Sequence, residues 1–145
     1  MLRFEFSIEI DRPPSEVFTF ITDASRLPEW QSDVVKAEWQ GEPGQGARIR
    51  EVRRFLGRRV EIEQEVTDYE PGRRFGLRAV SGPFPLSVMV MLEPRNDGTT
   101  LRLSGEAEPG GFFTLAEPLV GRAAQRQART DFETMKHILE GTSPS

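Results

Sequence analysis

Apolar and polar residues alternate along most of this chain, and Pro and Gly residues interrupt the alternation. The first alternating segment spans 4–10, with Phe or Ile at every second position, which predicts a strand with one buried face. Pro13-Pro14 ends it, and apolar residues at helical spacing follow over 14–21. Asp23 can cap a second short turn over 23–27. The chain is therefore expected to begin with a strand and two short helices.

Six more strands are expected after these helices. Turn-forming residues, mostly Gly, Pro, Asn and Asp, separate them. The predicted strands span 33–39, 47–55, 59–68, 74–80, 84–93 and 99–107.

A long helix is predicted over 114–140. Thr114-Leu115-Ala116-Glu117 fits a capping box at its start, and Gly141 is a natural stop. At 1.5 Å per residue, such a helix would be roughly 40 Å long. We interpret 1–140 as one domain, a usual size for a single core, and 141–145 as a flexible tail.

Charge pairing predicts the register of the hairpin around Leu56-Gly57. With those two residues as the turn, Arg lies opposite Glu on one face, and a slip by one residue would exchange the two faces. The expected pairs are Arg48 with Glu65, Arg50 with Glu63, Ile49 with Gln64, Glu51 with Ile62 and Arg53 with Val60. For the next hairpins we expect Val66 with Phe75, Gln64 with Leu77, Glu63 with Arg78, and, around Asp97-Gly98, Leu92 with Leu103 and Val90 with Gly105.

These registers predict a sheet with one apolar face and one charged face, as is typical of an antiparallel sheet buried on one side. Glu51, Arg53 and Gln64 are exceptions, because they fall on the apolar face. Charged groups there need partners or water. Two interpretations stay open: the three line a wet cavity, or Glu51 and Arg53 only pair with each other at the edge of the sheet.

Composition excludes some functions. The chain has 145 residues with 19 basic and 23 acidic side chains, and this negative balance argues against nucleic-acid binding. One His and no Cys make a metal site improbable, and no motif indicates a cofactor. No apolar run approaches the roughly 20 residues that span a bilayer, and no secretory leader precedes the first strand, so we expect a cytoplasmic protein.

Several short motifs occur in an order typical of one superfamily. They are Pro13-Pro14-Ser15-Glu16-Val17-Phe18, Leu27-Pro28-Glu29-Trp30, Gly44-Gln45-Gly46, Val66-Thr67-Asp68-Tyr69-Glu70-Pro71, Leu92-Glu93-Pro94 and Asp97-Gly98-Thr99-Thr100-Leu101. With the long C-terminal helix, they make the chain resemble the START-like (SRPBCC, helix-grip) superfamily, in its polyketide cyclase/dehydrase-like branch.

The resemblance implies an α+β helix-grip fold. A seven-stranded antiparallel sheet would curve around the C-terminal helix, with two short helices between the first two strands and a hydrophobic cavity inside. Members of the superfamily bind lipids, hormones or polyketides, and some catalyse cyclisation or dehydration. The resemblance carries over no catalytic residue.

Our first hypothesis is that an apolar or amphipathic small molecule binds in this cavity, because such pockets are mostly apolar with a few placed polar groups. Glu51, Arg53 and Gln64 would hold its polar end. The predicted lining is Trp30, Val35, Ile49, Glu51, Arg53, Ile62, Gln64, Phe75, Leu77, Val90, Leu103, Leu119 and Phe132.

Two other hypotheses belong to different classes. A cyclase or dehydratase would use Glu51 for proton transfer and Arg53 to steady an enolate oxygen, although an ion pair between them would oppose this. A protein-interaction module, or a homodimer, would use Met89 and Met91 on the outer face.

Overall fold

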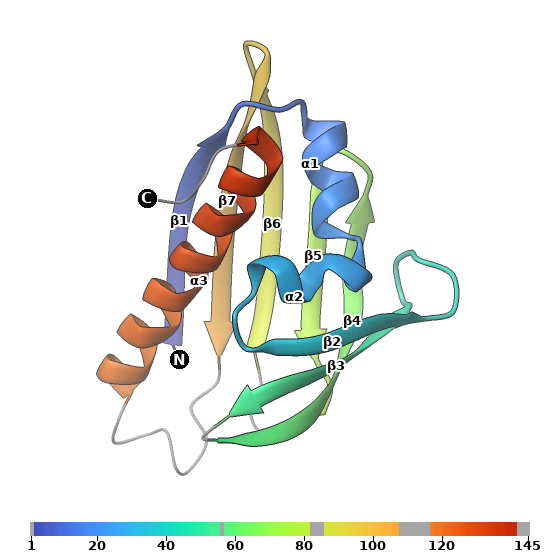
Figure 1. Ribbon diagram of the computed structural model, residues 1–145, viewed down its shortest axis with the longest axis vertical. Helices are drawn as coiled ribbons and strands as arrows, with labels where there is room; N and C mark the ends of the chain where they lie inside the picture. The colour runs from blue at the N-terminus through green and yellow to red at the C-terminus, as the bar shows by residue number, and fades with distance from the viewer. Residues whose placement is uncertain (1, 56, 82–85, 108–116, 142–145) are drawn as a thin grey trace.

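The computed structural model describes residues 2–55, 57–81, 86–107 and 117–141; within these ranges it leaves out the side chains of Leu2, 117–121 and Ala124 (Figure 1). The predicted order of strands and helices is confirmed. The elements are β1 (Leu2–Ile10), α1 (Pro14–Ile21), η1 (Ala24–Arg26), α2 (Leu27–Trp30), β2 (Val34–Gln40), β3 (Arg48–Phe55), β4 (Arg58–Glu70), β5 (Arg74–Ala79), β6 (Leu86–Arg95), β7 (Gly98–Ala107) and α3 (Glu117–Glu140). The capping box predicted at 114–117 lies largely outside the described residues.

All seven strands form one antiparallel sheet in the order β1-β7-β6-β5-β4-β3-β2. From β2 to β7, each strand pairs with the next one in the chain. The short helices between β1 and β2 carry the chain from one edge of the sheet to the other. Figure 1 shows α3 lying obliquely across the β1 and β7 end, with α1 and α2 over the same face. The sheet and its helices thus form the helix-grip fold.

The hairpin of β3 and β4 has the predicted register. Arg48 pairs with Glu65, Glu51 with Ile62 and Arg53 with Val60.

The predictions for two later hairpins were wrong by two residues. Val66 pairs with Leu77, because β4 runs on to Glu70 and bulges between Val66 and Asp68, so Arg78 binds Glu65 rather than Glu63. Val90 pairs with Leu103, because the turn forms at Asn96-Asp97, where Asn96 has a φ of 54°.

An offset of two residues leaves each side chain on its predicted face, since the faces of a strand alternate with a period of two. The inner face therefore stays apolar. On the outer face Met91 is 37% exposed, whereas Met89 is partly buried. Their role in a protein contact stays a prediction.

The C-terminal half of α3 is fastened to the sheet by packing and polar contacts. Met135 is fully buried, and the Phe132 ring meets Phe6 edge-on with centroids 6.0 Å apart. At the end of the helix, Lys136 Nζ donates to the Glu9 carbonyl oxygen (2.6 Å), and Glu140 Oε2 accepts from the Asp11 amide (2.8 Å). No helix in the described ranges is long and apolar enough to cross a membrane.

We expect Met135→Ala to destabilise the fold by about 2–5 kcal/mol, because it removes a completely buried side chain between α3 and the sheet. Glu133→Ala, an exposed position on the same helix, is the control and should change the free energy of unfolding by less than about 0.5 kcal/mol. Urea unfolding followed by circular dichroism measures both. Equal effects would show that α3 is not held by this packing.

Candidate ligand-binding cavity

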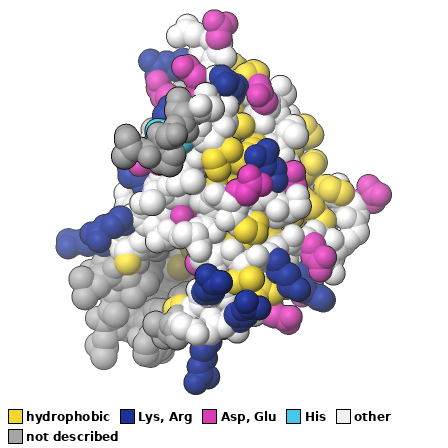
Figure 2. All heavy atoms as spheres, in the orientation of Figure 1, with side chains coloured by type: hydrophobic (Ala, Val, Ile, Leu, Met, Phe, Trp, Pro, Cys, Tyr) yellow, Lys and Arg dark blue, Asp and Glu magenta, His cyan; other side chains and the backbone are white. Residues whose placement is uncertain are grey.

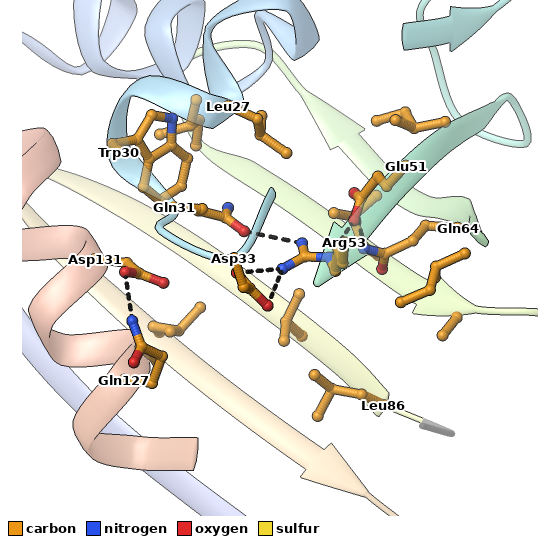
Figure 3. Close-up of a pocket in the computed structure, with 18 of the residues that line it drawn as sticks. Leu27, Trp30, Gln31, Asp33, Glu51, Arg53, Gln64, Leu86, Gln127 and Asp131 are labelled. Carbon is orange, nitrogen blue, oxygen red and sulfur yellow. Dashed lines mark hydrogen bonds and ion pairs between the residues drawn. The ribbon is translucent and has the colours of Figure 1, made fainter. Parts of the chain in front are cut away.

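A cavity of about 390 Å³ lies between the inner face of the sheet and the helices η1, α2 and α3. Its lining is predominantly apolar, with a few polar side chains near α2 and β3 (Figure 3). The predicted residues that line it are Trp30, Ile49, Glu51, Arg53, Ile62, Gln64, Phe75, Leu77, Val90, Leu103 and Phe132. That these residues contact a ligand stays a prediction.

Two predicted residues are not placed in the lining. Val35 is the extra residue of a bulge in β2, where Val34 pairs with Arg53 and Lys36 with Val52. The bulge turns Val34 into the core, where it is 6% exposed, and Val35 does not line the cavity. Leu119 belongs to α3, but its side chain lies outside the described part of the structure.

Arg53 is the centre of a polar cluster on the cavity wall (Figure 3). Its Nε donates to Glu51 Oε1 (2.6 Å), and Nη1 donates to both carboxylate oxygens of Asp33 (3.1 Å each). Nη2 donates to Gln31 Oε1 (2.9 Å), and Gln64 Nε2 donates to Glu51 Oε2 (2.9 Å). The ion pair predicted between Glu51 and Arg53 is therefore present, and it lies on the wall of the cavity.

Burial makes this cluster structurally important. Glu51 is 1% exposed and the Arg53 side chain 19%. Burial opposes the charge of the guanidinium, but Glu51 and Asp33 outweigh it and raise the pKa of Arg53 above its ordinary value. Both Glu51 oxygens accept hydrogen bonds from side chains, so proton transfer by Glu51 would require the ion pair to open first. Its catalytic role stays a prediction.

A second polar group, Asp131 on α3, reaches the cavity from the opposite side (Figure 3). It is 7% exposed. Its Oδ1 accepts from Gln127 Nε2 (2.8 Å) and from the Ser32 amide (3.5 Å). Burial has the largest effect on the pKa of Asp131 and raises it. The two hydrogen bonds and the charge of Arg53 lower this pKa, while the charge of Asp33 raises it. The net result is a pKa above the ordinary value for Asp. The result is a carboxyl group whose charge is unfavourable in the folded state.

Sequence reasoning missed six polar residues of the described lining, namely Thr22, Gln31, Asp33, Arg54, Gln127 and Asp131. One signal was available for Asp131. It lies three residues after Ala128 and four before Met135, so it falls within the apolar stripe of the last helix, where a carboxylate is unusual. Gln31 lies between α2 and β2, where no periodic pattern indicates a direction.

The charged groups form no metal site within the described ranges. No three His, Cys, Asp or Glu side chains there come together as metal ligands. Figure 2 shows that, on the face bearing the helices, side chains of both charges are spread over the surface with hydrophobic ones between them. The described part of this face therefore has no broad field of one sign.

The family is established by a match over residues 1–140 to the model described as "Polyketide cyclase / dehydrase and lipid transport". The chain belongs to this family, and the START-like resemblance is confirmed. An uncharacterized protein of Mycobacterium tuberculosis is 28% identical, with 97% of this chain and 98% of that protein covered.

Solved structures of low sequence identity share the fold. A START superfamily protein from Mycobacterium smegmatis has a TM-score of 0.80 at 14% identity, with 96% of this chain and 97% of that one covered. An aromatase/cyclase from Streptomyces sp. R1128 has a TM-score of 0.77 at 16% identity, with 95% of this chain and 93% of that one covered. The family and fold support a role in ligand binding or cyclisation.

We expect Arg53→Met to destabilise the protein by about 3–5 kcal/mol, because it leaves the buried Glu51 carboxylate without its charged partner. Combining it with Glu51→Gln should recover much of the loss. The control, Arg48→Met, breaks a more exposed ion pair with Glu63 and should cost at most about 1 kcal/mol. A double-mutant cycle by urea unfolding measures these values. Similar losses for Arg53→Met and Arg48→Met would contradict the structural role.

We expect Asp131→Asn to be more stable than the natural chain at pH 7. Because the folded state raises the pKa of Asp131, the natural chain loses stability as pH rises from the ordinary Asp range through that raised pKa, and Asn does not. The advantage should therefore shrink as pH falls to about 4 and below. Urea unfolding at several pH values measures it, with Glu133→Gln as the exposed control. A difference independent of pH would be inconsistent with this account.

Proposed function

We propose that the protein binds an apolar or amphipathic small molecule in the cavity between the sheet and α3. The observation that carries the proposal is a mostly apolar space of about 390 Å³ with polar side chains on two opposing walls. This volume lies within the usual range for ligand pockets, roughly 300–1,000 Å³. The apolar lining would provide most of the affinity, and the polar groups would orient the ligand.

The family supports the same proposal, since its description includes lipid transport as well as cyclisation and dehydration. The structure adds a physical reason why this space is not filled by side chains. The inner face of β3 bears the ion pair of Glu51 and Arg53, and packing apolar side chains over it would desolvate the guanidinium, which is still 19% exposed. Water or a ligand with polar atoms is the more favourable neighbour.

An acid–base enzyme of the cyclase or dehydratase type is the second candidate. Asp131 favours it, because a carboxyl group on the cavity wall whose pKa is raised by burial is a candidate for taking up and releasing a proton. Native mass spectrometry of the purified protein would identify a co-purified molecule. Incubation with that molecule would then distinguish the candidates, since an enzyme changes its mass or bond arrangement and a binding protein releases it unaltered.

We expect Val88→Trp to abolish binding of a neutral apolar dye such as Nile red, because Val88 lines the cavity and the indole would occupy it. Met89→Trp is the matched control, since the next residue of β6 points to the other face of the sheet. Fluorescence titration should give one dye per chain for the natural protein and for Met89→Trp. Circular dichroism verifies that both variants fold. Unchanged binding to folded Val88→Trp would place the dye elsewhere.

A further inference from the structure

The charged groups on the cavity walls are unequal in number. Among the described residues of the lining, three are acidic and two are basic: Asp33, Glu51, Asp131, Arg53 and Arg54. Arg54 is exposed, so its charge is largely screened by solvent. Of the other four groups, Glu51 and Asp131 are buried, whereas the side chains of Asp33 and Arg53 are 40% and 19% exposed. Carboxyl groups therefore outnumber the guanidinium groups on the inner walls.

The Arg53 guanidinium is already occupied. Arg53 donates to Glu51, to both oxygens of Asp33 and to Gln31. A ligand carboxylate approaching Arg53 would meet two carboxylates that bind it first, and replacing them would leave Glu51 buried and unpaired. The cavity is thus poorly suited to an anionic ligand, although it contains an arginine.

The opposite wall offers an acceptor without a donor. Both hydrogen bonds of the Asp131 side chain use Oδ1, and no described residue donates to Oδ2. Gln64 likewise uses its amide nitrogen on Glu51, and no hydrogen bond among the described residues uses its carbonyl oxygen. A carboxylate oxygen on a cavity wall favours a hydrogen-bond donor, and a charged donor most of all.

Aromatic rings in the same lining strengthen this preference. The ring centroids of Trp30 and Phe132 are 5.0 Å apart, and both residues line the cavity. Aromatic rings near a carboxylate are a favourable environment for an ammonium group. The buried Trp30 Nε1 has no hydrogen-bond partner among the described residues, and it lies on the side of the indole away from Asp131 (Figure 3). The Trp30 N–H therefore does not supply the hydrogen-bond donor that the Asp131 carboxylate lacks.

We propose that the cavity selects amphipathic molecules whose polar end is a hydrogen-bond donor, above all a protonated amine bound by Asp131 Oδ2. The proposal rests on the proposed binding function and specifies its ligand class. Neutral alcohols rank second, because a hydroxyl donates without adding a charge. Carboxylates of the same length rank last, because they meet an acidic interior.

The test uses three ligands that differ only in the polar end: decylamine, 1-decanol and decanoate. Each displaces Nile red from the full chain at pH 7 and about 150 mM salt, below its micellar concentration. Because a hydrogen bond between charged groups is about twice as strong as one between neutral groups, we expect decylamine to bind on the order of tenfold or more tightly than decanoate. Asp131→Asn should remove most of this preference and leave 1-decanol nearly unchanged, whereas Glu133→Gln should retain it.

The outcomes separate this inference from the function on which it rests. Decanoate binding as tightly as decylamine, or an amine preference that survives in Asp131→Asn, would overturn the donor selectivity and leave apolar binding intact. If neither Nile red nor any of the three ligands binds, the proposed function fails, and the selectivity fails with it.

Discussion

The ion pair between Glu51 and Arg53 constrains the inner face of the sheet more than any other contact. A carboxylate that is 1% exposed is tolerable only beside a partner, and Arg53 is held on its other side by Asp33. If apolar side chains packed over this cluster, the solvation free energy lost by the charged groups would exceed the free energy gained by burying apolar surface. Meanwhile the C-terminal half of α3 packs tightly through Met135. The fold therefore closes at one end of the helix and leaves a space beside its middle.

The two polar walls give this space a direction. Arg53 and its partners come from β3 and the segment after α2, while Asp131 comes from α3. A molecule between them would have its apolar body against the sheet and its polar end near α3. The family includes proteins described by cyclisation, dehydration and lipid transport, and one apolar cavity can serve any of these if the polar groups on its walls differ.

Much of the fold could be predicted from the sequence, because alternation and turn residues act locally. The register around Leu56-Gly57 followed from Arg–Glu pairing, and the positions of Glu51, Arg53 and Gln64 on the inner face followed from it. The bulges at Val35 and Thr67 could not be predicted, because a bulge depends on how strands twist against distant neighbours. Asp33 and Asp131 were missed because their places on the cavity walls depend on tertiary packing between α2, β3 and α3.

The central claim is that the space beside α3 holds a guest molecule, and native mass spectrometry of the protein as purified tests it most directly. The account predicts a population heavier than the bare chain by one small molecule, which is lost on denaturation, and the same complex after incubation of stripped protein with an apolar amine. Only the bare mass, both as purified and after incubation with apolar amphiphiles of every charge, would contradict the account.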